Sequence, residues 1–224
     1  NMRALPGHSG LGQVRYPTAG DAYNEEEAQP FYVNAPFGIV LVHNGNLTNA
    51  HALRAELFST DHRHTNTDSD SEVLLNVLAH EIEKSTRGVP LLVDDVFAAV
   101  RAVHARIKGS YAVIAMIAGH GVLAFRDPFG IRPLCLGRSK DGTVMVASES
   151  VALEGTGHEF ERNVAPGEAV FIDLQGQVHS QQCAAAAQLN PCIFEFVYLA
   201  RPDSVLDNIS VYQARLNLGE ALAK

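Results

Sequence analysis

The sequence predicts an α+β fold of sandwich type, with helices in its first half and strands mostly in its second. Two observations predict this class. Apolar residues recur at helical spacing between residues 50 and 107, and from residue 111 short apolar runs alternate with turn residues. Because the connections between those runs are short, neighbouring strands should pair antiparallel. The composition, 46% hydrophobic and 19% charged, is that of a chain with a substantial buried core.

The first elements in chain order are a hairpin and a helix. Two β-rich runs, Phe31–Asn34 and Ile39–His43, flank a turn-forming Pro-Phe-Gly segment. The residues His43–Asn46 contain an Asn-Gly pair and predict a tight turn, because glycine supplies the positive φ that such turns require. A helix capped by Thr48 or Asn49 should follow.

Two further helices precede the strands. Ser69–Glu72 fits the S-x-x-E capping box of a helix start, and a third helix should begin at about Asp95. A last helix is expected within Ser210–Lys224. Between these helices the pattern predicts strands at Tyr111–Ala118, Val122–Arg126, Leu134–Gly137, Val144–Ser148 and Ala169–Asp173.

Charge and hydropathy exclude several classes of partner. The net charge is −8 and no short window gathers Lys or Arg, so we expect no nucleic-acid partner. The longest apolar run, Ala112–Ala118, is too short to cross a bilayer as a helix, so we expect no membrane contact. The first residues contain no signal-peptide core, and the three cysteines form no C-x-x-C motif. These features favour a reducing, cytoplasmic location.

The first candidate binding segment is Arg15–Gly20. An arginine at the end of a strand suits bidentate capture of a carboxylate, and Thr18 offers a hydroxyl nearby. The polar segment that follows, Gly20–Glu27, is a candidate lid. The alternative is a surface arginine in a turn stiffened by proline.

The second candidate is the pair Asn44 and Gly45. An asparagine amide beside a glycine N–H provides two donors that can point at one atom, which is what an oxyanion hole requires. The alternative is a turn whose residues are chosen only for their φ angles.

The third candidate is the acidic run Asp68-x-Asp70-x-Glu72. Asp70 is expected either to offset the helix dipole or to accept a substrate ammonium group. Three alternating acids also suggest a metal site, but the glycine and the distal glutamate of a calcium loop do not follow. We therefore predict no metal site here.

Eight segments in order carry a resemblance to one family. They include VRYPTAG at Val14–Gly20, HNGNLTNA at His43–Ala50, SDSE at Ser69–Glu72, FRDPFGIRPL at Phe125–Leu134 and YLARPDS at Tyr198–Ser204. The others are EAQPF at Glu27–Phe31, ASESVA at Ala147–Ala152 and VAPGE at Val164–Glu168. Together they resemble the glutaminase domain of the amidophosphoribosyltransferase family.

The resemblance implies a fold and a reaction. The fold is that of N-terminal-nucleophile hydrolases, a four-layer αββα sandwich with antiparallel sheets. The reaction is release of ammonia from glutamine, for transfer to phosphoribosyl pyrophosphate in the first step of purine (IMP) synthesis. The alternatives are another class II glutamine amidotransferase and a non-catalytic glutamine-binding or regulatory module.

The resemblance also implies roles for individual residues. Arg15 would hold the α-carboxylate of glutamine with help from Thr18, and Asp70 would take the α-ammonium group. Asn44 and the Gly45 N–H would form the oxyanion hole, and these roles are the ones already suggested by the residue types. One further residue, Tyr16, would signal between domains.

The sequence departs from the family at its start, where Asn1 stands in place of the nucleophilic N-terminal cysteine. We expect the chain to be a fragment cut at both ends, and the 224-residue polypeptide to be inactive alone. Residues 1–200 would form the glutaminase domain without its first strand. Residues 201–224 would be a linker and the start of a phosphoribosyltransferase domain.

The expected partners and cofactors follow from that division. Glutamine would bind this chain, and phosphoribosyl pyrophosphate the missing domain, which would also hold Mg²⁺. We expect no cofactor in the chain itself. The full-length protein should be a homo-oligomer.

Overall fold

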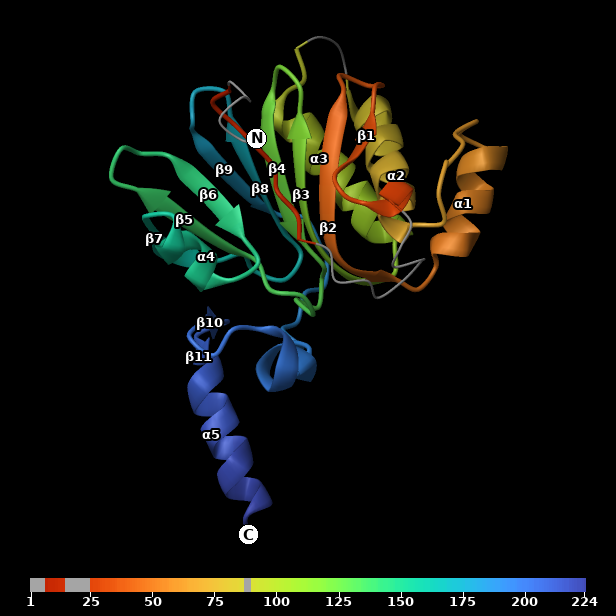
Figure 1. Ribbon diagram of the computed structural model, residues 1–224. Coiled ribbons are helices and arrows are strands. Elements are labelled where there is room, and N and C mark those ends of the chain that lie inside the picture. The colour runs from red at the N-terminus through yellow and green to blue at the C-terminus, as the bar shows by residue number, and fades with distance from the viewer. Residues whose placement is uncertain (1–6, 15–24, 87–89) are drawn as a thin grey trace.

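The computed structural model describes residues 7–14, 25–86 and 90–224. Its main body has four layers, which are helices, a six-stranded sheet, a three-stranded sheet and a short helix (Figure 1). Every strand pair is antiparallel. The predicted α+β class, with its four-layer αββα arrangement, is therefore confirmed.

The large sheet has the order β1-β2-β3-β4-β8-β9. Its long central strands are β2 and β3, which pair over their whole lengths from Ile39↔Ile117 to Leu47↔Gly109. The bounds of its strands are β1 Phe31–Val33, β2 Ile39–Leu47, β3 Gly109–Ile117, β4 Gly121–Arg126, β8 Glu168–Asp173 and β9 Val178–Gln182.

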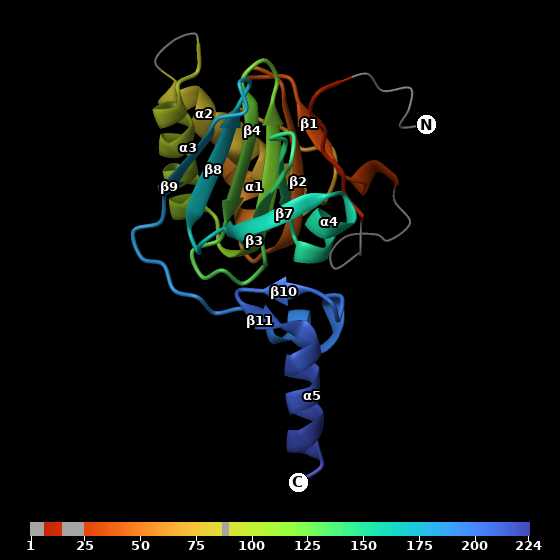
Figure 2. The same cartoon turned by 90° about the vertical axis from the view of Figure 1, so that its left-hand side faces the viewer.

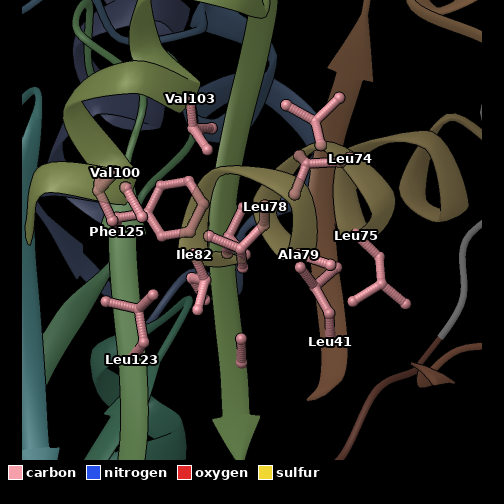
Figure 3. Close-up of a cluster of buried hydrophobic side chains, with 14 of the residues drawn as sticks. Leu41, Leu74, Leu75, Leu78, Ala79, Ile82, Val100, Val103, Leu123 and Phe125 are labelled. Atoms are coloured by element: carbon pink, nitrogen blue, oxygen red, sulfur yellow. The ribbon is translucent and has the colours of Figure 1, made fainter. Parts of the chain in front are cut away.

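Three helices lie on one face of this sheet. They are α1 (Ala50–Ser59), α2 (Asp70–Ser85) and α3 (Val93–Arg106), and a short 3-10 turn, η2 (Glu25–Glu27), precedes β1. Alternate residues of the strands meet the apolar stripes of the helices, as the packing of α2 and α3 against β2, β3 and β4 shows (Figure 3). This interface is the main core of the protein.

The small sheet covers the other face of the large one and has the order β6-β5-β7 (Figure 2). Its strands are β5 (Cys135–Ser139), β6 (Val144–Ala147) and β7 (His158–Asn163), and α4 (Ser150–Gly155) packs on its outer side. A second apolar cluster, which includes Ala112, Ala124 and Val170, fills the space between the sheets.

The last part of the chain forms a separate small unit, which we call the C-terminal module (residues 195–222). It consists of a π-helical turn η3 (Glu195–Leu199), a hairpin of β10 (Val205–Leu206) and β11 (Ile209–Ser210), and α5 (Val211–Leu222). Its own apolar cluster includes Phe196, Leu206 and Val211. In both views α5 projects away from the sandwich (Figures 1 and 2).

The predicted hairpin, the predicted helices and the five predicted strands are confirmed, with shifts of one or two residues at most ends and with β2 continuing to Leu47, four residues past the predicted end at His43. One prediction was wrong, because His43–Asn46 is no turn but part of the extended strand β2. Seven elements were not predicted, namely α4, β7, β9, the turns η2 and η3, and the short strands β10 and β11. The sequences of β7, HEFERN, and β9, VHSQQ, are too polar to show a hydrophobic alternation.

The helix starts differ in detail from prediction. Asn49 precedes α1, but its side chain bonds to the backbone of Arg106 and Lys108 and makes no cap. Ser69 does cap α2, where its hydroxyl accepts from the Ser71 N–H. Glu72 does not complete the capping box, because its carboxylate takes the donors of the preceding loop.

Candidate functional site

The site begins at the free edge of β2, beyond the point where β1 ends. In an antiparallel strand, successive N–H groups point to opposite neighbours. Even-numbered residues of β2 bond to β3, as the flanking bonds Ala118 N to Gly38 O and Thr48 N to Lys108 O show. The N–H groups of His43, Gly45 and Leu47 therefore point to the opposite edge.

Two of these three outward N–H groups donate hydrogen bonds to side-chain oxygens. The Gln29 Oε1 atom accepts from His43 N at 2.6 Å, and the Asp70 Oδ2 atom accepts from Leu47 N at 2.8 Å. The Gly45 N–H lies between them on the edge that faces away from β3, and among the described residues no side chain, turn or loop accepts a hydrogen bond from it. It is a donor held in extended backbone and available to a ligand.

Glycine at position 45 is required by close approach of β3. Its φ is +151°, and a Cβ atom there would lie 2.0 Å from the Ser110 carbonyl oxygen. Any larger residue would push β2 away from β3. The Asn-Gly pair thus serves strand packing, which is the physical reason that the turn prediction was wrong.

Asn44 lies on the inner face of β2 and lines a cavity of about 530 Å³ at the open end between the two sheets. Val42 on the same strand and Ala112 on β3 share this face, because strand side chains alternate. The cavity is of the size that holds a small metabolite. Gly45 and Asp70 line it as well, so all three predicted residues that the structure describes share one cavity.

Asp70 is the first residue of α2, at the positive end of the helix dipole. One carboxylate oxygen holds the Leu47 N–H, and the Ser71 hydroxyl donates to the other at 3.4 Å. Its side chain keeps 13% of its surface exposed. The carboxylate is therefore fixed, partly open to the cavity, and able to accept a further donor.

His43 is buried behind this edge. Its Nδ1 atom lies 3.0 Å from the Ser71 Oγ atom and 3.9 Å from an Asp70 oxygen. Loss of hydration lowers the pKa of His43, although the Asp70 charge acts in the opposite direction. The ring is therefore neutral at pH 7, and its role is to pack and hydrogen-bond under the edge of β2.

The opposite wall of the cavity is charged and involves the C-terminal module. Arg132 donates to the Glu195 carboxylate at 2.6 Å, and both residues line the cavity with Leu199. Burial raises the pKa of Glu195, with Arg132 opposing the change.

Glu149, also a lining residue, holds the loop after η3. It accepts from the Arg201 N–H at 2.8 Å and from the Ser204 hydroxyl at 2.6 Å. The wall of the cavity is thus joined to the C-terminal module by side chains of the sandwich.

Three predicted site residues, Arg15, Tyr16 and Thr18, lie outside the described residues. Gly12, Gln13 and Val14, which directly precede them, line the cavity. Sequence reasoning missed Gln29, His43, Arg132 and Glu149 as site residues. All four lie within segments that resemble the family, which are EAQPF, HNGNLTNA, FRDPFGIRPL and ASESVA. The resemblance marked these segments, but it assigned no role to the four residues.

The cysteines lie away from the cavity, since none of the three is among its described lining residues. Burial raises the pKa of the Cys135 thiol to about 12 and that of Cys183 to about 11, so both remain protonated at pH 7. Among the described residues no group of three or more His, Cys, Asp or Glu side chains is placed to hold a metal ion. No helix in that part of the chain is long and apolar enough to cross a membrane.

The comparisons with known proteins agree on one family. A family described as glutamine amidotransferase domain matches residues 20–155. The amidophosphoribosyltransferase of Escherichia coli strain K12 is 55% identical over 228 residues, which cover the whole of this chain and 45% of the relative. That of Schizosaccharomyces pombe is 49% identical and covers 99% of this chain and 44% of the relative.

A solved structure gives the same result. The glutamine phosphoribosylpyrophosphate amidotransferase from B. subtilis, complexed with ADP and GMP, superposes with a TM-score of 0.77 and 33% identity. The match covers 94% of this chain and 43% of that one. The chain therefore spans a little under half the length of the proteins it matches.

Proposed function

The chain belongs to the glutamine amidotransferase family, and from this membership we propose that its cavity binds glutamine and presents the side-chain amide for hydrolysis to ammonia. The observation that carries the proposal is the edge of β2. There the Gly45 N–H is left open between two occupied donors, beside Asn44 and within the cavity that Asp70 lines.

Each residue has a role that its chemistry supports. The Gly45 N–H and the Asn44 amide stabilise the oxyanion that forms when the amide carbonyl is attacked, and one such donor lowers a barrier by about 3–4 kcal/mol. Asp70 accepts the α-ammonium group. Arg15, assisted by Thr18, holds the α-carboxylate, and Tyr16 signals to the neighbouring domain.

For the whole protein we propose the amidophosphoribosyltransferase reaction. Ammonia released in the cavity passes to phosphoribosyl pyrophosphate and gives 5-phosphoribosylamine in purine synthesis. Phosphoribosyl pyrophosphate and Mg²⁺ bind a phosphoribosyltransferase domain that begins within residues 201–224, after a glutaminase domain within 1–200. The assembled enzyme is a cytoplasmic homo-oligomer. The names of the relatives support this proposal, and so does their length.

The test is glutamine binding by the 224-residue chain, measured by calorimetry. Asp70→Asn should lower the affinity for glutamine at least tenfold. An amide in place of the carboxylate loses a charge-assisted hydrogen bond that contributes about 1.5–3 kcal/mol. Asp68→Asn is the matched control. Asp68 is an exposed acid two residues away that pairs with Arg54, and its replacement should leave binding unchanged.

Two results would contradict the proposal. One is a wild-type chain that binds L-glutamine no better than D-glutamine, and the other is an equal effect of the two aspartate substitutions.

A further inference from the structure

Gln29 takes the place of a strand partner at the edge of β2. The backbone pairing of β1 with β2 ends at Phe31↔Leu41. At the next outward-pointing residue, His43, the Gln29 side chain accepts from the N–H at 2.6 Å and donates to the C=O at 3.1 Å. A primary amide has the donor and acceptor that a neighbouring peptide group would otherwise provide.

The same amide also reaches the start of α2. Gln29 Nε2 lies 3.1 Å from the Ser71 Oγ atom, and that hydroxyl contacts the His43 ring and the Asp70 carboxylate. One side chain therefore joins the edge of β2 to the helix end that carries Asp70. The two parts of the cavity that would meet opposite ends of glutamine are tied together by it.

We propose that Gln29 is a positioning residue for the oxyanion hole. It fixes the β2 backbone at His43, two residues before the Gly45 N–H, so that this donor keeps its direction into the cavity. The inference rests on the proposed function, because it assumes that the Gly45 N–H meets the amide carbonyl of glutamine.

The chemistry requires glutamine at this position. Leucine has a similar size but neither donor nor acceptor, so the His43 N–H and C=O would lose both bonds. Glutamate keeps the shape and an acceptor for the N–H, but its carboxylate would repel the His43 carbonyl oxygen. Both variants should let the direction of the Gly45 N–H vary more. Gln29→Glu should have this effect with less change in packing.

The test compares two ligands on the same variants by NMR titration. L-Glutamine carries the side-chain amide, and L-norvaline has the same α-amino and α-carboxylate groups but a methyl group in place of the amide. Gln29→Leu should lower the affinity for glutamine about tenfold, as loss of one well-aligned hydrogen bond does. The same substitution should lower the affinity for norvaline less than twofold. Gln29→Glu should change the two affinities in the same unequal way.

Gln181→Leu is the matched control, because Gln181 is exposed on β9 far along the large sheet, and it should change neither affinity. Equal weakening of both ligands by Gln29→Leu and Gln29→Glu would show a merely structural role and overturn the inference. So would no change for either. Failure of the wild-type chain to bind glutamine would instead contradict the proposed function. The experiment therefore distinguishes failure of the inference about Gln29 from failure of the proposed function.

Discussion

At position 45 a single hydrogen atom in place of a methyl group allows two strands to approach. The Ser110 carbonyl lies where a Cβ atom would be, and the positive φ of Gly45 is costly for other residues. The same backbone leaves the Gly45 N–H open to the cavity. Strand packing and the proposed hydrogen bond to a ligand thus depend on the same residue, so a substitution at position 45 would disturb both.

Replacing Gly45 tests this statement. Gly45→Ala should lower the free energy of unfolding by at least about 1–3 kcal/mol, which is the usual cost of a strained φ, with the steric overlap added. Urea titration measures it. Gly119→Ala is the control, because Gly119 also has a positive φ, +74°, but no atom lies within 4 Å of its added Cβ. If both substitutions cost the same, the close approach of Ser110 contributes nothing.

Among the elements, β2 shows what could be read from the sequence and what could not. The β-rich and apolar runs of β1, β2 and β3 and the apolar stripes of α2 and α3 predicted these elements, apart from the end of β2, because each pattern is local. The Asn-Gly pair suggested a turn, since nothing local reveals that Ser110, 65 positions later, approaches Gly45. The bonds of Gln29 to His43 and Ser71 also join distant segments, so their residue types alone could not predict them.

The contact between α3 and the large sheet contains a titrating side chain. His104 bonds to the Tyr111 hydroxyl at 2.8 Å and packs edge to face on Phe125. Burial lowers the pKa of His104 to about 4. In an unfolded chain the pKa of histidine is about 6.5, so the unfolded state binds the proton more readily between these values.

The contribution of His104 to the free energy of unfolding should therefore be fully present above about pH 6.5 and be lost as the pH falls toward 4. The loss should amount to up to about 3 kcal/mol. His104→Gln removes this titration and should flatten the profile of unfolding free energy over that window. His51→Gln, at an exposed position of α1, is the control and should leave the wild-type slope. An unchanged slope in His104→Gln would contradict the assignment.

For the whole molecule, a buried arginine adds to the contacts of Glu149 and Arg132 that join the sandwich to the C-terminal module. Both terminal nitrogens of Arg126 bond to the Asp207 carboxylate at 2.8 Å. The same guanidinium also holds the backbone carbonyls of Gly130 and Arg132, in the loop that carries the cavity wall. Breaking a buried pair leaves an uncompensated charge, which is costly.

Asp207→Asn should therefore loosen the module by about 3 kcal/mol, because Arg126 stays buried and charged. Hydrogen exchange of residues 195–211 measures this as faster exchange at this joint than in α2. Asp203→Asn breaks the exposed pair with Arg201, which water and salt screen, and should leave the exchange of these residues nearly unchanged. Similar exchange in the two variants would mean that the buried pair does not hold the module.

Glu195 and Leu199 belong both to the C-terminal module and to the wall of the cavity. Whatever ligand fills that cavity and contacts this wall therefore favours the docked position of the module. Thermodynamic reciprocity then requires that docking of the module raise the affinity for the ligand by the same factor. A force or a partner that acts on α5, far from Gly45, would then change the affinity of the cavity for that ligand through this shared wall.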